Sequence, residues 1–338
     1  MQQKKKTNIK LNFLKGIACI SVVFIHFTFP GQIGQIIDYA SKYAVPVFLM
    51  ITGYYAYGSK SETIGHRAFK LFRMLCIGYF LFFAVNFAGA LVRNQGHDWL
   101  NTYFSWKTPV EYLIFCTIEF ALPLWYLIAM IESYFVWYFV VKHKKEQAVL
   151  KLLPVLFLFR AILDFCCDIM HMPWIFTINF AASALNWFLL GYVLRTDKMD
   201  NFRNTKAFNL ILMTIIGLVF VIAPVLFNLS FTFSIAGLLP YSLGLFTLFL
   251  RNENQSICKS IEYIGEKLSL YIYILHCPID FVLGFFCKQI LGFDLTTPFW
   301  GWIWPVVILL SSIFASWIIY QFQKSITKHK LNSFSPSH

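Results

Sequence analysis

Charged residues are scarce in this 338-residue chain. They make up 13% of it, whereas hydrophobic residues make up 58%. Soluble domains carry about 25% charged residues, so this composition excludes an ordinary water-soluble fold. The formal net charge of +12 is typical of some nucleic-acid-binding proteins, but here the basic residues are scattered among short loops between apolar segments. We therefore expect membrane lipids as partners, and no nucleic acid.

Other patterns are missing as well. The eight cysteines include no C-x-x-C spacing, which argues against a metal or redox motif of that kind. Alternating ten-residue strand patterns are absent, which excludes a transmembrane barrel. No low-complexity linker, internal repeat or appended soluble domain is visible. The longest stretch between apolar segments, residues 93–120, is rich in aromatic residues and is a candidate for a partly folded lid.

What the chain does contain is a series of apolar runs of about 18 to 25 residues, the length that a membrane-spanning helix needs. We predict an all-α, polytopic membrane protein with ten transmembrane helices. The predicted spans are residues 11–29, 36–57, 70–92, 121–141, 149–165, 174–194, 207–228, 230–250, 268–290 and 299–322.

The distribution of Lys and Arg predicts the orientation of these spans. With both termini cytoplasmic, Arg160 falls within a span, and the outer segments hold only Lys42, Arg93, Lys107 and Lys288. This bias satisfies the positive-inside rule. We therefore predict a basic cytoplasmic N-terminus (1–10), a single transmembrane domain (11–322) and a basic cytoplasmic tail (323–338).

The first apolar run carries two ionisable side chains. Lys15 precedes His26 by eleven residues, or about three helical turns plus 20°, so both project from one face about 16 Å apart along the axis. Lys15 can extend its amine to the membrane surface, whereas His26 reaches into the hydrocarbon layer. One interpretation of His26 is a structural histidine bonded to a carbonyl or hydroxyl group. The other is a general base in a cavity for the acceptor.

Basic residues also cluster where the third apolar run begins, at Lys60, Arg67, Lys70 and Arg73. Lys70 and Arg73 are three residues apart and therefore share one face of the helix that enters the membrane. The four residues of this cluster are either ordinary positive-inside charges or a clamp for the phosphates of an anionic cytoplasmic ligand, because an ammonium and a guanidinium together suit phosphate.

Polar groups also interrupt later runs. His276 lies in the ninth run two residues before Pro278, which favours a kink of the kind found beside cavities; a structural histidine fits equally well. Glu132 follows Trp125 by seven residues, on nearly the same helix face. Because an isolated buried carboxylate is costly, we expect Glu132 to be paired or hydrated. His276, Glu132 and Trp125 are therefore candidate cavity-lining residues.

Several segments resemble the motifs of the membrane acyltransferase-3 family, and they occur along the chain in the order that the family shows. Lys15-x10-His26 is similar to its basic-x10-His motif, and Lys70-x-x-Arg73 to its Arg-x-x-Arg motif. The other similar segments are residues 45–54 (VPVFLMITGY), 123–127 (PLWYL), 188–192 (FLLGY) and 268–276 (LSLYIYILH). The resemblance covers residues 8–322.

The resemblance implies a ten-helix membrane enzyme that takes an acyl group, usually acetyl, from cytoplasmic acyl-CoA and places it on a hydroxyl. It implies that His26 is the catalytic histidine, and that Lys15, Lys70 and Arg73 hold the coenzyme A phosphates and pantetheine arm. Positions 15 and 70 usually carry Arg in the family. Lys keeps the charge but lacks the bidentate fork, so we expect phosphate contact with less geometric control. Thr52 replaces the usual Ser and keeps a hydroxyl.

Acyl transfer from a thioester to an alcohol needs a base for the hydroxyl, donors to the oxyanion and exclusion of water. His26 meets the first need, and the candidates for the second are Tyr54, Tyr126, Tyr271 and Tyr273. We therefore expect an O-acyltransferase of the bacterial plasma membrane that uses acyl-CoA as co-substrate and no metal. The expected acceptor is a cell-surface or lipid-linked glycan. A glycan or anion transporter and an inactive regulatory protein stay open as alternatives, as does a covalent acyl intermediate on His26.

Overall fold

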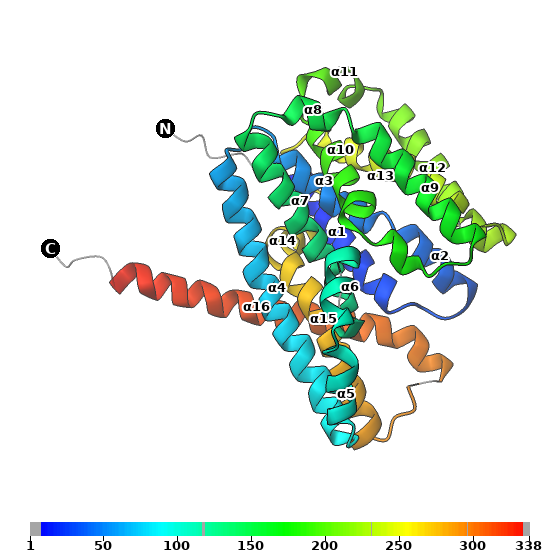
Figure 1. Ribbon diagram of the computed structural model, residues 1–338, viewed down its shortest axis with the longest axis vertical. Coiled ribbons are helices and arrows are strands. Elements are labelled where there is room, and N and C mark those ends of the chain that lie inside the picture. Colours follow the sequence, from blue (N-terminus) through cyan, green and yellow to red (C-terminus); the bar gives the residue numbers. More distant parts are fainter. Residues whose placement is uncertain (1–7, 117–118, 231, 296, 334–338) are drawn as a thin grey trace.

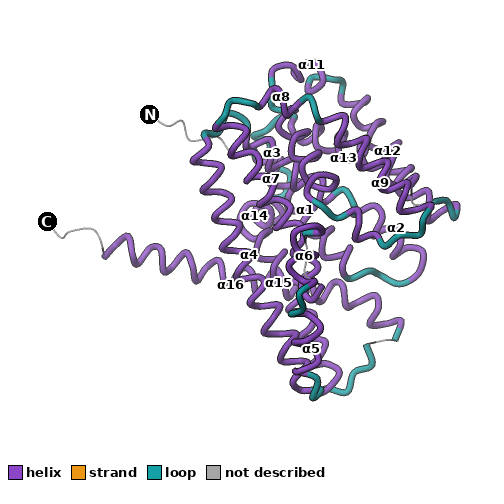
Figure 2. The backbone as a smooth tube through the Cα atoms, in the orientation of Figure 1, coloured by secondary structure: helices purple, strands orange, loops and turns teal. Residues whose placement is uncertain are grey.

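The computed structural model describes residues 8–116, 119–230, 232–295 and 297–333. In these residues it contains helices and loops but no strand (Figure 2). The all-α prediction is confirmed. Most helices pack into one body, and the final helix extends away from it toward the C-terminus (Figure 1).

The helices follow one another with short connections. In the first half of the chain they are α1 (Ile9–His26), α2 (Gly31–Ser41), α3 (Ala44–Ala56), α4 (Ser61–Val92), α5 (Gly96–Tyr103), α6 (Lys107–Phe115), η1 (Glu119–Leu124), α7 (Trp125–Lys142), α8 (Glu146–Leu150) and α9 (Leu153–Ile169). In the second half they are η2 (Trp174–Thr177), η3 (Phe180–Leu185), α10 (Asn186–Leu194), η4 (Asp197–Met199), α11 (Asp200–Arg203), α12 (Ala207–Phe227), α13 (Thr232–Leu250), α14 (Lys259–Tyr263), η5 (Ile264–Leu268), α15 (Ser269–Phe285), η6 (Phe286–Ile290) and α16 (Pro298–Ser333).

Six helical segments of the described chain are long and apolar enough to cross a membrane: Ile9–His26, Ser61–Val92, Glu119–Lys142, Ala207–Phe227, Lys259–Ile290 and Pro298–Thr327. Two shorter apolar helices span Phe180–Leu194 and Ser234–Leu250. Large apolar side chains on the outer helices are exposed, among them Phe80 (70%), Phe208 (70%) and Phe314 (61%). Such a surface suits lipid rather than water, so the chain is a multi-pass membrane protein. The count of ten spans stays a prediction.

Three of the predicted spans are interrupted. Residues 36–57 form α2 and α3, which are separated at Lys42 and Tyr43. Residues 149–165 fall on the end of α8 and on most of α9. Residues 174–194 are divided between η2 and the continuous η3 and α10, which are separated at Ile178 and Asn179. Pro46 lies in the first turn of α3 and Pro154 in the first turn of α9. Because proline has no N–H to donate to the preceding turn, a new helix begins just before each of them.

Within the stretch 93–120, residues 93–116 and 119–120 are folded rather than extended. The Trp99 ring of α5 lies 5.6 Å from Phe83 on α4 and 5.4 Å from Phe120, measured between centroids. The proposed lid thus includes α5 and is held by aromatic contacts, whereas residues 117–118 lie outside the described residues. At the other end, α16 passes residue 322 without a break and continues to Ser333, so the predicted tail begins within a helix.

The backbones of α3 and α10 approach each other closely in the core. An added Cβ on Gly53 would lie 1.8 Å from the carbonyl oxygen of Phe188, and one on Gly191 would lie 2.0 Å from that of Met50. Only glycine permits backbones to approach this closely, as in many membrane helix pairs. This contact fixes α3, and with it the cavity wall that α3 contributes.

Candidate functional site

A cavity of about 440 Å³ is lined by side chains of α1, α3, α4, α7 and α15. It brings together three cationic side chains, Lys15 on α1 and Arg67 and Lys70 on α4. The rest of the lining is largely apolar and aromatic: Phe48, Ile51, Thr52, Tyr55, Leu71, Tyr126, Met130, Tyr134, Ser269, Leu270 and Tyr273. No carboxylate of the described residues lines this cavity, so it suits a ligand that is anionic at one end and apolar along its length.

Arg67 is held in place by α3. Its guanidinium donates to the carbonyl oxygen of Tyr55 over 2.9 Å, which leaves further N–H groups for a ligand. Lys15 is half-buried at the cavity wall, and Lys70 is exposed. The two α4 residues lie in the part of this 32-residue helix that precedes its most apolar stretch. At 1.5 Å per residue α4 is about 48 Å long, which exceeds the roughly 30 Å of a hydrocarbon layer. The basic end of the cavity therefore lies toward a membrane surface.

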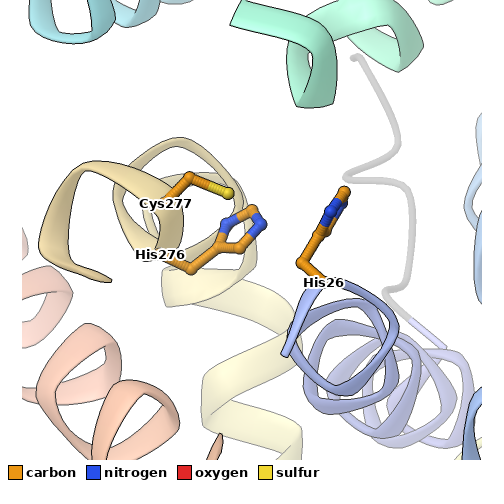
Figure 3. A group of neighbouring side chains, drawn as sticks. All are labelled: His26, His276 and Cys277. Atoms are coloured by element: carbon orange, nitrogen blue, oxygen red, sulfur yellow. The ribbon is translucent and has the colours of Figure 1, made fainter. Parts of the chain in front are cut away.

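His26 is the last residue of α1, eleven residues after Lys15 of the cavity. Its side chain is exposed and does not line the cavity. Its ring centroid lies 5.0 Å from that of His276 on α15, and the two rings face one another across the space between the helices (Figure 3). His26 thus lies beside a second candidate histidine from a distant part of the chain.

The surroundings of His276 define its protonation. The side chain is fully buried, and Nδ1 lies 3.1 Å from the carbonyl oxygen of Ile272. Because a carbonyl only accepts, Nδ1 carries the proton and Nε2 holds a lone pair. That Nε2 has no hydrogen-bond partner among the described residues.

Tyr273 connects the cavity with the histidine pair. Its side chain lines the cavity, and its ring centroid lies 6.0 Å from that of His276, one helical turn further along α15. Its hydroxyl donates to the carbonyl oxygen of Pro123. The neighbouring α1 has the same arrangement: Lys15 lines the cavity, and His26 lies further along the helix, beside His276. Two adjacent helices thus carry a line of side chains from the basic end of the cavity to His26.

Of the other residues predicted from the sequence, Tyr126 lines the cavity and Trp125 is half-buried beside it, with ring centroids 6.5 Å apart. Glu132 accepts a hydrogen bond from the Cys116 thiol over 3.0 Å, so this carboxylate is paired, but it does not reach the cavity. Tyr54 lines a separate polar pocket of about 580 Å³, where its hydroxyl accepts from Arg195.

Arg73 does not line the cavity. Its side chain is exposed, as are the rings of Phe69 and Phe72, which precede it by four residues and by one residue. Six residues separate it from Arg67, which corresponds to about 120° around the helix. The two arginines therefore project in different directions, and only Arg67 of the two lines the cavity. Arg67 and Lys70 line the cavity, so the basic pair of α4 at the cavity lies three residues earlier than the pair assigned from the motif.

Arg67 belongs to the basic cluster that is a candidate phosphate clamp, but it is not among the residues to which the family resemblance assigns coenzyme A binding. The signal that identifies it is its three-residue spacing before Lys70, which is the same spacing as that of Lys70 and Arg73. Tyr55 and Tyr134, which line the same cavity, were not anticipated, because no sequence pattern relates α3 to α7.

One group of side chains has the donor atoms of a metal site. A ring nitrogen of His26, a ring nitrogen of His276 and the sulfur of Cys277 all lie within 4.8 Å of one another. This group adjoins the histidine pair and not the basic end of the cavity.

Comparison with curated proteins and with solved structures found no match. A family model described as an acyltransferase domain, that of acyltransferase-3, matches residues 8–321. The match includes every residue that lines the cavity as well as His26 and His276. The resemblance seen in the motifs is confirmed: the chain belongs to the acyltransferase-3 family of acyltransferase domains.

Proposed function

We propose that this protein is an O-acyltransferase that moves an acyl group, acetyl in the simplest case, from cytoplasmic acyl-CoA to a hydroxyl of a cell-surface or lipid-linked glycan. The observation that carries the proposal is the line of side chains from the basic cavity to His26 along α1 and α15. Membership of an acyltransferase family supports the reaction class. The bacterial plasma membrane as the location, ten spans and two cytoplasmic termini belong to the same proposal.

The donor occupies the cavity in a defined direction. The phosphates of coenzyme A bind Lys15, Arg67 and Lys70, because guanidinium and ammonium groups stabilise phosphate through charge-assisted hydrogen bonds. The pantetheine arm then extends along the apolar and aromatic wall. The rise of α1 between Lys15 and His26 is about 16 Å, a span that this long, flexible arm can cover. The thioester thereby approaches the histidine pair.

The chemistry assigns one step to each group. A neutral His26 imidazole accepts the proton of the acceptor hydroxyl while the hydroxyl oxygen bonds to the thioester carbonyl carbon. The tetrahedral oxyanion then collapses, the carbon–sulfur bond breaks, and coenzyme A leaves as the thiolate. The imidazolium returns its proton to that thiolate. An ester of the acceptor and free coenzyme A result, and His26 is regenerated.

The tyrosines differ in their fitness as oxyanion donors. Tyr271 already donates to Gln323 over 2.6 Å, Tyr273 donates to a backbone carbonyl, and Tyr54 lies in the other pocket. The Tyr126 hydroxyl has the sulfur of Met130 as its acceptor at 3.2 Å, which is a weak partner. Tyr126 is therefore the hydroxyl most easily redirected toward an oxyanion, and its ring lies 5.4 Å from that of Tyr273. For the thioester to pass, the Tyr273 side chain moves off the carbonyl of Pro123.

The test is acyl transfer by the purified protein in liposomes. Acetyl-labelled acetyl-CoA is supplied on the side of the basic cavity end together with a lipid-linked glycan fraction, and label in the glycan and release of coenzyme A are measured. We expect both, in equal amounts, and neither with His26→Ala. Movement of the glycan across the liposome membrane without coenzyme A release would instead support the transporter alternative.

A further inference from the structure

Beside the proposed catalytic base lies a group of side chains that the acyl-transfer steps leave unused. Cys277 and His276 extend from α15 toward His26 at the end of α1 (Figure 3). The sulfur and one nitrogen from each ring lie within 4.8 Å of one another. The three donors come from two helices that are far apart in the sequence and packed together in the fold.

The orientation of His276 is the first reason to assign a ligand here. Its Nδ1–H is committed to the carbonyl oxygen of Ile272, 3.1 Å away, so the ring presents the lone pair of Nε2 to the space beside His26. Metal-binding histidines are commonly held in this way, with the other ring nitrogen bonded to a carbonyl. Nε2 is fully buried and has no partner among the described residues, so it lacks the hydrogen bond that a buried nitrogen normally has.

The donor set is the second reason. Two imidazole nitrogens and one thiolate are the ligands preferred by zinc and chemically similar metals, whereas magnesium and calcium need oxygen ligands. We propose that His26, His276 and Cys277 form a binding site for a zinc-class divalent metal ion. Three protein ligands leave one tetrahedral position for water or another small ligand. Binding releases the Cys277 thiol proton to solvent, and the bound ion and thiolate together carry one positive charge.

The site is open on one side and closed on the other. His26 is exposed, so the ion can arrive at that side, while His276 closes the buried side. The rings of Phe27 and Tyr273 each lie 6.0 Å from the ring of His276 and form apolar walls. A metal ion bound to His26 uses the lone pair of its neutral imidazole. In the metal-bound protein His26 therefore cannot accept a proton as the proposed base.

The test uses the full-length protein in detergent, treated with a chelator and then titrated with Co²⁺ alone, without acyl-CoA or acceptor. We expect a thiolate-to-cobalt charge-transfer band that saturates at one equivalent and disappears when Zn²⁺ is added. In Cys277→Ser the band should be absent and the Zn²⁺ affinity lower by more than about tenfold, since even outer partners of a metal site contribute about 10- to 100-fold. Cys76→Ser is the control. It changes an exposed thiol on α4, outside the proposed site, and should behave as the unchanged protein.

A second measurement locates the ion without any variant. Zn²⁺ should slow alkylation of Cys277, read by peptide mass analysis, and should leave alkylation of Cys76 unchanged. The proposal is overturned if cobalt gives no charge-transfer band in the unchanged protein, or if the band persists in Cys277→Ser. Because neither measurement involves acyl transfer, failure of the metal site and failure of the proposed enzyme are distinguishable.

Discussion

The ring of His26, at the end of α1, lies 5.0 Å from the ring of His276, in the middle of α15. His276 offers a lone pair on that side, because its other nitrogen is bonded to Ile272. A lone pair facing His26 favours the tautomer in which His26 points its N–H toward it. The second nitrogen of His26 is then free to accept a proton. The pairing thus favours the tautomer of His26 that the reaction needs.

If His26 is the base, removing it should affect turnover and leave donor binding intact. We expect His26→Ala to lower kcat about 100- to 10,000-fold, the usual range for a general base, with little change in the KM for acetyl-CoA. Labelled acetyl transfer by liposomes with matched protein amounts measures both constants. His143→Ala, at an exposed histidine after α7, is the control and should retain full activity. Unchanged kcat in His26→Ala would remove the proposed base.

The cavity predicts which basic residues of α4 contact the donor. Arg67→Ala and Lys70→Ala should each raise the KM for acetyl-CoA by about 10- to 100-fold, because a hydrogen bond to a charged group is worth about 1.5–3 kcal/mol. Arg73→Ala removes a charge of the same helix that does not line the cavity, so its KM should change much less.

Initial rates over a range of acetyl-CoA concentrations separate these variants. A KM effect of Arg73→Ala as large as that of Arg67→Ala would contradict the assignment from the cavity and support the one from the motif. A fall in kcat at constant KM in either cavity variant would show that the residue acts in the chemical step instead.

The fold class was predictable because apolar length is a local property of the sequence. The long runs at α1, α4, α12 and α16 could be recognised from composition alone. Helix breaks were harder. Pro46 and Pro154 lie inside apolar runs that look continuous in the sequence. A proline in the first turn of a helix barely changes the hydropathy of the run, but the preceding helix ends before it.

The site was predictable only as separate residues. The eleven-residue spacing identifies Lys15 and His26 as one helix face, because both lie on α1. Nothing in the sequence relates His26 to His276, since that contact depends on how α1 and α15 pack. The assignment of Arg73 shows the same limit. The three-residue spacing is the same in the pair Arg67 and Lys70 as in the pair Lys70 and Arg73. Which pair lines the cavity depends on how the neighbouring helices pack against α4.

The glycines of the 45–54 and 188–192 segments are expected to be structural. Gly53→Ala and Gly191→Ala would each place a Cβ within about 2 Å of a backbone oxygen of the facing helix, so α3 and α10 must separate. Overpacking of this kind costs about 1–3 kcal/mol, and we expect a lower Tm of the detergent-purified protein. Gly65→Ala is the matched control, because its Cβ would meet only the Tyr138 ring at 3.6 Å. Equal Tm values for all three variants would contradict this packing.

Zinc should inhibit acyl transfer if the metal site and the catalytic base share His26. We expect Zn²⁺ to lower kcat of the unchanged protein and a chelator to restore it. An ion bound to the His26 nitrogen that faces His276 leaves the imidazole proton on the other nitrogen, which then has no lone pair for the hydroxyl proton. Cys277 has no role in the acyl-transfer steps, so Cys277→Ser should keep its basal activity and need at least about tenfold more Zn²⁺ for the same inhibition. Transfer rates measured across a Zn²⁺ series for the unchanged protein, Cys277→Ser and Cys76→Ser decide the point. Identical inhibition curves for the three would show that zinc acts elsewhere, since only Cys277 lies within 4.8 Å of both histidine donors.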